Sequence, residues 1–184
     1  MPEAVPPLRG GLRHVYARRW QHGHVPTPDF VLALRAHVGH QSLPLVGVTA
    51  VVLRDENVLL VRRADNRRWT PVTGIVNPGE EPADAAARET LEEAGVVAEP
   101  QRLALVHTLP PVTYPNGDVA QFLDLVFLMR WVAGEPFPAD DENIAAYWFP
   151  LDDLPKLEQG HRARIEAARS LETTTRFVRS RRRD

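Results

Sequence analysis

Residues Gly74–Val96 read GIVNPGEEPADAAARETLEEAGV, and the second half of this stretch has the pattern of a short helix. Proline suits the first position of a helix and glycine the position just past its end, so we expect a helix from Pro82 to Ala94, followed by Gly95. Three glutamates of this helix are spaced at i, i+3 and i+4 and share one face: Glu89, Glu92 and Glu93.

This carboxylate cluster is badly placed for helix stability. Like charges at this spacing destabilise a helix by roughly 0.2–0.5 kcal/mol per pair, and the cluster lies near the negative end of the helix dipole. Arg88 relieves only part of the repulsion, because it lies four residues from Asp84 and from Glu92. A solvated acidic face is the ordinary explanation of paired glutamates. Here a divalent cation bound by oxygen ligands, Mg²⁺ or Mn²⁺, is the more economical one.

The whole stretch resembles the signature box of the Nudix hydrolases. That box has a glycine, five residues, a glutamate, seven residues and then the pattern REuxEExGu. Every charged and glycine position of the box is present here at its spacing. The resemblance extends over roughly residues 45–154. One departure is Val72-Thr73 before Gly74, where the family commonly has Pro-Gly. Because a β-branched residue rarely adopts a positive φ, we expect the backbone of this loop to differ.

The resemblance implies an α/β fold, a Nudix-type α/β/α sandwich around a mixed sheet, with an N-terminal and a C-terminal helix added. It implies a metal-dependent hydrolase that cleaves the diphosphate linkage of a nucleoside diphosphate derivative, using Mg²⁺ or Mn²⁺. By position, the metal ligands would be three carboxylates and a backbone carbonyl: Glu89, Glu92, Glu93 and Gly74. Glu92 and Glu93 would matter most for catalysis, while Arg88 and Glu80 would pair to hold the helix against the loop.

A further acid is expected before the late tryptophan. Glu142 lies six residues ahead of Trp148 and is our first candidate for an extra metal ligand or the general base. Asp140, Asp141 and a merely solvated loop are the alternatives.

The substrate is left open at this point among a nucleotide sugar such as ADP-ribose, a nucleoside triphosphate and a dinucleoside polyphosphate. Pro111 resembles a mark of ADP-ribose hydrolases, and Tyr114 one of dinucleoside polyphosphate hydrolases, although both residues are common in turns. Strand alternation favours Arg63 for a phosphate contact. Trp69 and Tyr114 are candidates for stacking on a base, as is Phe122, but aromatic residues in strands more often belong to the core.

Outside the box the spacing of apolar residues changes from a helical to an alternating pattern. We expect a helix capped by Thr27, strands at 46–53 and 58–61, a loop at 65–81, and strands at 105–109, 120–132 and 145–149. We expect a helical C-terminal segment that begins at 151–154 and includes 162–171. We divide the chain into an arm and short helix (1–44), the catalytic domain (45–155), and a C-terminal helix with a basic tail (156–184).

Composition narrows the function classes. The 184 residues contain no cysteine, which excludes a disulfide framework, a Cys-ligated zinc site and a thiol nucleophile. It also argues against a diphosphate isomerase of the same fold that relies on cysteine. The net charge of −2 gives no case for nucleic-acid or membrane binding, and no apolar stretch is long enough to cross a bilayer. We expect a soluble, cytoplasmic enzyme with a small-molecule nucleotide substrate, and a homodimer is an option that stays open.

Two sets of residues are given a minor role. The histidine pairs His22 with His24 and His37 with His40 lack a third ligand at a suitable spacing, so zinc is not favoured. The arginines at 179 and 181–183 are read as a solvated tail rather than a docking segment. The rival to hydrolysis is a catalytically silent sensor of a nucleotide metabolite, which would have no need of an intact carboxylate cluster.

Overall fold

The structure, a computed structural model, describes residues 27–179, so the expectations for the arm, for His22 and His24 and for positions 181–183 lie outside it. Three helices are present in this range: α1 (Asp29–Val38), α2 (Pro82–Ala94) and α3 (Gln159–Arg169). Nine strands accompany them in the same range: β1 (Leu43–Arg54), β2 (Asn57–Arg63), β3 (Trp69–Thr70), β4 (Val72–Ile75), β5 (Val97–Thr108), β6 (Val112–Thr113), β7 (Val119–Ala133), β8 (Asn143–Pro150) and β9 (Arg176–Phe177).

The strands form one mixed sheet, as predicted. Its main path runs β3-β2-β1-β7-β5-β9, while β4 pairs with β1, β6 with β7 and β8 with β2. The central pair, β1 and β7, is parallel and keeps one register from Leu43 opposite Ala120 to Leu53 opposite Arg130. Apart from β5 with β9, the other pairs are antiparallel.

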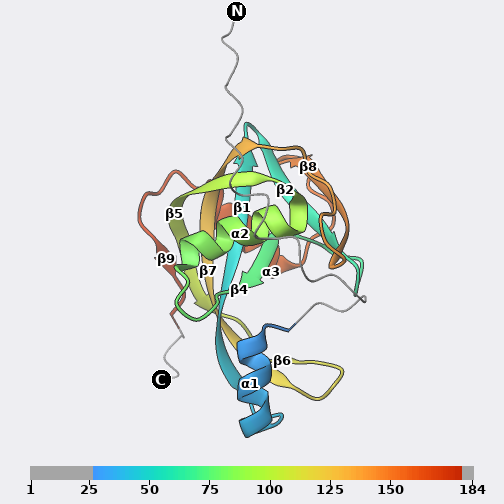
Figure 1. Cartoon of the computed structure of the whole chain (residues 1–184). Coiled ribbons are helices and arrows are strands. Elements are labelled where there is room, and N and C mark those ends of the chain that lie inside the picture. The colour runs from blue at the N-terminus through green and yellow to red at the C-terminus, as the bar shows by residue number, and fades with distance from the viewer. Residues whose placement is uncertain (1–26, 180–184) are drawn as a thin grey trace, which may run out of the picture.

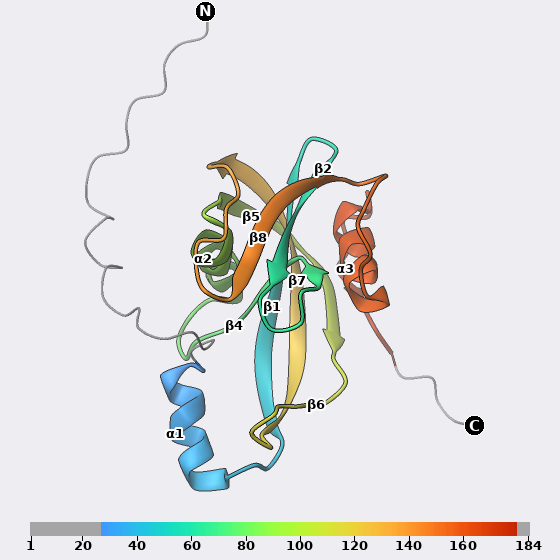
Figure 2. The same ribbon diagram turned by 90° about the vertical axis from the view of Figure 1, so that its right-hand side faces the viewer.

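Helices cover both faces of this sheet, with α2 on one side and α3 on the other (Figure 2). Along β1 the side chains alternate: Val48 and Val52 belong to the core beneath α2, and Val51 belongs to the core beneath α3. Both cores consist mainly of buried aliphatic residues. The expected α/β/α sandwich with added terminal helices is therefore confirmed.

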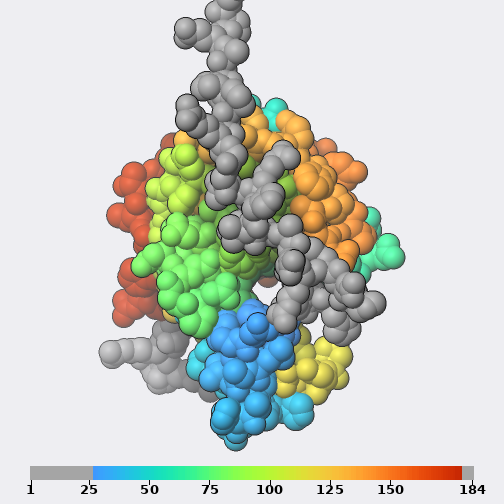
Figure 3. Space-filling view, viewed as in Figure 1, coloured from blue at the N-terminus to red at the C-terminus, as the bar shows by residue number. Residues whose placement is uncertain are grey.

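Helix α1 lies below α2, at the end of the molecule that also carries β6 (Figures 1 and 3). Its buried residue, Val31, packs on Leu43, Leu45 and Ala120. The predicted cap is wrong, because the helix is preceded by Pro28 in an extended conformation (ψ 141°) and no side chain caps it. The Pro28 carbonyl instead accepts from the first amides of the helix.

The segment predicted as a loop at 65–81 contains two short strands. β3 pairs with β2 and β4 with β1, and each is too short to show an alternating pattern in the sequence. Thr73 lies in β4 opposite Thr49, and its φ is not positive. Strand pairing holds Thr73 extended, as its β-branched side chain favours, and the expected difference from the family's usual backbone stays a prediction.

The C-terminal part also differs from prediction. Residues 151–154 form a turn rather than a helix, since Leu154 precedes Pro155 and a residue before proline avoids the helical region. The Leu151 amide donates instead to the Glu56 carbonyl (2.9 Å). Helix α3 begins only at Gln159, and the pairing of β9 with β5 was not anticipated. Within residues 27–179 no helix is long and apolar enough to span a membrane.

Candidate active site

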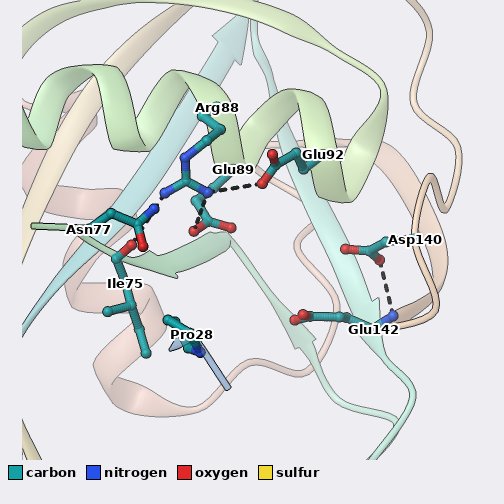
Figure 4. Close-up of a pocket in the computed structure, with 8 residues that line it drawn as sticks. All are labelled: Pro28, Ile75, Asn77, Arg88, Glu89, Glu92, Asp140 and Glu142. Atoms are coloured by element: carbon teal, nitrogen blue, oxygen red, sulfur yellow. Dashed lines mark hydrogen bonds and ion pairs between the residues drawn. The ribbon is translucent and has the colours of Figure 1, made fainter. Parts of the chain in front are cut away.

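Helix α2 has the ends predicted from the sequence. Pro82 occupies the first turn, and Gly95 ends the helix in the left-handed conformation (φ 67°), where its amide donates to the Leu91 carbonyl. Alanines of α2 pack on the sheet and are fully buried, among them Ala85 and Ala86. The glutamate face is thereby directed along the edge of the helix toward β4 and the loop that precedes β8 (Figure 4).

Arg88 donates hydrogen bonds to several glutamates on and near this face. Its Nε and Nη2 donate to the two carboxylate oxygens of Glu80, at 2.7 and 3.0 Å. Its Nη1 donates to Glu89 and to Glu92, each at 2.9 Å (Figure 4). The hydrogen bond from Arg88 holds the pKa of Glu80 below its usual value. The expected contact between helix and loop is therefore present, and the same guanidinium faces two of the clustered carboxylates.

Gly74 is required by the position of Glu89. A Cβ atom on Gly74 would lie only 2.1 Å from the Glu89 carboxyl carbon, far inside van der Waals contact. Any larger residue would displace Glu89 from the cluster. The reason for the first glycine of the box is thus steric, and it connects β4 to α2.

The register of β4 decides where its carbonyl groups point. Val76 donates its amide to the Val46 carbonyl (3.1 Å), and hydrogen-bonded pairs alternate along an antiparallel ladder. Gly74 therefore turns its carbonyl toward β1. The Ile75 carbonyl turns the other way and accepts from the α2 guanidinium at 3.3 Å. Thr73 shares the direction of Ile75, so the carbonyl role expected of Gly74 fits Thr73 better.

Burial perturbs the carboxyl groups of α2. Glu93 is only 4% exposed, and this burial, with the nearby charge of Glu89, raises the pKa of Glu93 well above its usual value. Burial also raises the pKa of Glu89 to about 7. The Glu93 carboxylate accepts a hydrogen bond from Asn143 Nδ2 at 2.9 Å. A nearby cation would stabilise the charged forms of the Glu89 and Glu93 carboxyl groups.

The loop between β7 and β8 closes over the end of α2. Phe137 donates its amide to the Ala94 carbonyl, and Ala139 donates to the Glu93 carbonyl, both at 3.1 Å. The Phe137 ring lies on Gly95, where a Cβ would come within 2.1 Å of it. These contacts satisfy carbonyl groups that a helix end leaves without partners. They also place the acids of the loop opposite α2.

Two of those loop acids reach the cluster and one does not. Burial and the charge of Asp140 raise the pKa of Glu142 to about 7, and burial also raises the pKa of Asp140. The Glu142 amide donates to Asp140 Oδ1 at 3.1 Å (Figure 4). Asp141 is exposed and turned away from the cavity.

A cavity of about 140 Å³ separates these two sets of acids. Glu89, Glu92 and Arg88 line one side, and Asp140 and Glu142 line the other (Figure 4). Three further residues complete the lining: Pro28, Ile75 and Asn77. The residue that precedes helix α1, Pro28, therefore contributes to the wall, which the sequence did not indicate.

Arg63 and Tyr114 are not among the residues that line this cavity, but Arg63 lies close enough to two of the acids to interact with their charges. Arg63 donates to both carboxylate oxygens of Asp65 (3.0 and 2.9 Å), and the nearby charges of Glu93 and Glu142 add to the rise in its pKa. Tyr114 is 42% exposed, and its pKa is raised by burial, an effect that the charge of Arg63 opposes. Tyr114 thus lies near Arg63, which in turn interacts with the charges of Glu93 and Glu142.

Other candidates lie elsewhere. Trp69 packs edge-on against Phe149 (4.8 Å between ring centres) in the core beneath α3, on the sheet face opposite α2. Phe122 packs beneath α1. His37 contacts the Ala33 carbonyl, and His40 contacts Asp118, so neither is near the cluster.

The side chains of the cluster are oxygen donors, which hard divalent cations prefer. Among residues 27–179, no three His, Asp or Glu side chains converge in the arrangement of a bound metal. Glu89 and Glu92 instead share the Arg88 guanidinium. The chemistry of the donor set nevertheless fits a cation, because four neighbouring carboxyl groups have raised pKa values and a cation would stabilise their charged forms: Glu89, Glu93, Asp140 and Glu142.

Comparison with known proteins agrees with this geometry. The model of the NUDIX domain matches residues 43–169. The chain belongs to the Nudix hydrolase family. A similar relative is the ADP-ribose pyrophosphatase of Methanocaldococcus jannaschii, 31% identical over 121 residues, which cover 64% of this chain and 69% of the relative.

Two further similarities concern Nudix proteins of bacteria. The NAD-capped RNA hydrolase NudC of Escherichia coli is 28% identical over 148 residues, 78% of this chain, which spans only about half (54%) of the length of NudC. The crystal structure of an ADP-ribose pyrophosphatase from Streptococcus suis superposes with a TM-score of 0.58 at 27% identity, covering 74% of this chain and all of that one. Nudix hydrolases generally use divalent metal ions and act on small nucleotides. As a member of this family, the chain is a hydrolase that acts on acid anhydrides.

Three features of the candidate site could not be predicted from the sequence. The direction of the Thr73 carbonyl depends on strand register. The contacts of Phe137 and Ala139 with α2 involve backbone groups, which leave no mark in the sequence. Asn143 follows Glu142 directly, but its approach to Glu93 depends on an irregularity in β8.

Proposed function

We propose that this Nudix hydrolase cleaves the diphosphate linkage of a nucleoside diphosphate derivative of the ADP-ribose type, with Mg²⁺ or Mn²⁺ as its cofactor. The observation that carries the proposal is the cavity with carboxyl groups on both sides, from α2 and from the β7–β8 loop, with Arg63 close by. A diphosphate brings negative charge into such a cavity, so a cation and an arginine are both needed to accept it.

The residues that would hold the cation are Glu89, Glu92 and Glu93 of α2, together with the Thr73 carbonyl. When bound, the cation would neutralise the diphosphate and lower the pKa of a bound water. Arg88 would keep α2 against the loop through Glu80, at 2.7 and 3.0 Å. This contact would hold the carboxylates in place while charge develops on the phosphate.

Glu142 is the residue that we assign as general base. It lines the cavity on the side opposite α2, and its pKa of about 7 suits proton transfer near neutral pH. It would accept a proton from the water that attacks phosphorus, while the bond to the bridging oxygen breaks. Arg63 would contact a phosphate oxygen, because its side chain points to the same side of the sheet as the cluster.

The ADP-ribose class is favoured by two observations. ADP-ribose pyrophosphatases are among the similar proteins in both sequence and structure. Pro111 also lies at the spacing that resembles these hydrolases. Tyr114 lies near Arg63 and would stack on or bond to the part of the substrate beyond the diphosphate. A dinucleoside polyphosphate is the second candidate, since Tyr114 is also its mark.

The test is release of phosphomonoesters from a panel of nucleotides. An internal diphosphate has no phosphomonoester, so alkaline phosphatase liberates phosphate only after the linkage has been cleaved. The panel comprises ADP-ribose, NAD, a nucleotide sugar and a dinucleoside polyphosphate; nucleoside triphosphates, which alkaline phosphatase attacks directly, are followed by chromatography. Each is assayed with Mg²⁺, with Mn²⁺ and with EDTA.

We expect metal-dependent cleavage of ADP-ribose to exceed that of the other substrates. Preference for a dinucleoside polyphosphate would reject the substrate class and keep the hydrolase. Binding of a nucleotide without cleavage of any member of the panel, in folded protein, would instead support the silent sensor.

A further inference from the structure

A β-bulge in β8 determines which side chain faces the cluster. β2 and β8 keep one register up to Arg62 opposite Ala145, and then shift so that Arg63 lies opposite Asn143. The extra residue on β8 is Ile144, which is 41% exposed. Without the bulge, Ile144 would lie opposite Arg63 and on its side of the sheet. The irregularity therefore exposes an apolar side chain and turns a polar one inward.

The Asn143 amide contacts two acids. The side chain is 5% exposed, and its Nδ2 donates to Glu93 Oε2 at 2.9 Å and lies 3.5 Å from Asp140 Oδ1. Because both neighbours are carboxylate oxygens, the nitrogen must face them. The other end, Oδ1, is buried and receives no hydrogen bond from the residues that the structure describes. A buried acceptor without a donor is unfavourable, so the contact with Glu93 determines how the amide lies.

The hydrogen bonding of Glu93 depends on this amide. Within the described part of the chain, Asn143 supplies the one side-chain hydrogen bond to the Glu93 carboxylate. The charged groups nearest to that carboxylate include further acids, Glu89, Glu142 and Asp140, which repel it. The backbone contact from Ala139 to the Glu93 carbonyl holds the helix but makes no contact with the carboxylate.

We propose that Asn143 is a positioning residue for Glu93, holding its carboxylate in the orientation that a divalent cation needs and coupling it to the loop that carries Glu142. This inference rests on the proposed function, because it assigns Glu93 to the cation. Partners that orient metal ligands typically affect metal affinity or activity by about 10–100-fold when they are removed.

Two measurements test the inference on the full chain. The first is a double-mutant cycle in urea unfolding without metal, with Asn143→Leu and Glu93→Gln alone and combined. We expect non-additivity of at least about twofold in the unfolding equilibrium constant. The second is Mn²⁺ binding by calorimetry, in which Asn143→Leu should raise the dissociation constant by about 10–100-fold. In the assay kcat should fall while the KM for the nucleotide stays the same.

Asn143→Ser serves if the leucine variant does not fold, because serine is too short to reach Glu93. Thr90→Val is the matched control: Thr90 is equally buried on α2, but its hydroxyl bonds only to the Ala86 carbonyl, so Mn²⁺ binding should not change. An additive cycle, or wild-type Mn²⁺ affinity in a folded Asn143 variant, would overturn the inference alone. Failure of the wild-type chain to bind Mn²⁺ would overturn the proposed function and this inference with it.

Discussion

The two faces of the sheet treat buried charge in opposite ways. Beneath α3, the Asp124 carboxylate is 2% exposed and is bonded by Thr49 (2.8 Å), His107 (2.7 Å) and Arg164 (2.8 Å). Beneath α2, Glu93 is buried to a similar degree, but its carboxylate has one neutral donor, Asn143, and is surrounded by further acids. The protein therefore supplies the Asp124 carboxylate with three donors, one of them cationic, whereas it supplies the Glu93 carboxylate with one neutral donor.

This difference indicates what each face is for. A carboxylate with a cationic partner and two further donors needs nothing from solution, so the Asp124 network serves to fasten α3 to the sheet. A buried carboxylate among like charges weakens the fold unless a cation is supplied. The face beneath α2 is therefore kept at some expense in stability, as is common at functional sites.

The largest expected effect comes from removing the charge of Asp124 on the face beneath α3. Asp124→Asn removes the charge that faces Arg164, which is itself only 5% exposed, and leaves that arginine uncompensated. We expect the free energy of unfolding to fall by about 3–5 kcal/mol, measured by urea denaturation. Activity per folded molecule should be unchanged, because the network lies on the opposite face from the cavity.

The control for this prediction removes both charges. In the double variant Asp124→Asn with Arg164→Met no ion is left buried, so much of the lost stability should return. If Asp124→Asn unfolds with the same free energy as the wild-type chain, the contrast between the faces is wrong.

The next largest effect comes from removing the charge of Glu93 on the face beneath α2. Glu93→Gln should leave the fold as stable or slightly more so, since it relieves like-charge repulsion. Loss of a cation ligand should remove several kcal/mol of transition-state stabilisation, or roughly 10²–10³-fold in turnover. The measurement is kcat on ADP-ribose at saturating Mg²⁺, with circular dichroism to show that the variant is folded.

Glu81→Gln is the matched control for that variant. Glu81 precedes the same helix, is exposed and makes no capping hydrogen bond through its side chain. Its substitution should leave turnover unchanged. Full activity of a folded Glu93→Gln protein would reject the assignment of Glu93 to the cation.

The features that could be predicted from the sequence are those set by one helix. The spacing of Glu89, Glu92 and Glu93 follows from helical periodicity, and Pro82 and Gly95 mark the ends of the helix because their backbone preferences are local. The strands were likewise indicated by apolar stretches between turns, whereas the mixed sheet was implied by the resemblance to the family. The features of the helix do not depend on a distant partner.

The features that could not be predicted depend on pairing between distant segments. Thr73 is extended because β4 pairs with β1, and Asn143 faces Glu93 because β8 bulges against β2. Trp69 was a candidate for substrate stacking, yet its strand register turns it to the face beneath α3. Single residues in short strands carry no period of their own, so their direction is known only from the sheet.

A third prediction sharpens the comparison through metal binding. A ligand that binds only the folded state stabilises it, by about 2.7 kcal/mol at a concentration 100 times its dissociation constant. Mn²⁺ should therefore raise the free energy of unfolding of the wild-type chain and of Asp124→Asn by similar amounts, and should not raise that of Glu93→Gln. Equal stabilisation of all three in urea titrations would mean that the cation binds away from α2.

The last prediction concerns the acid sensitivity of the face beneath α3. His161 accepts from Arg164 at 2.7 Å, and burial together with that positive charge lowers the pKa of His161 to about 4. The unfolded chain takes up this proton near its ordinary pKa of 6.5, which the folded chain refuses. Stability contributed by neutral His161 is therefore complete above pH 6.5 and is lost as pH falls toward about 4.

His161→Gln tests this, because glutamine keeps an acceptor for Arg164 and does not titrate. Unfolding free energies of the two proteins, measured in urea across that pH range, should converge as the pH falls, since only the wild-type chain loses the histidine contribution. Parallel curves would mean that His161 takes up its proton at the same pH in the folded and unfolded chains, and that Arg164 is not the neighbour that sets its charge. The face beneath α3 would then tolerate the same kind of charge conflict as the face beneath α2.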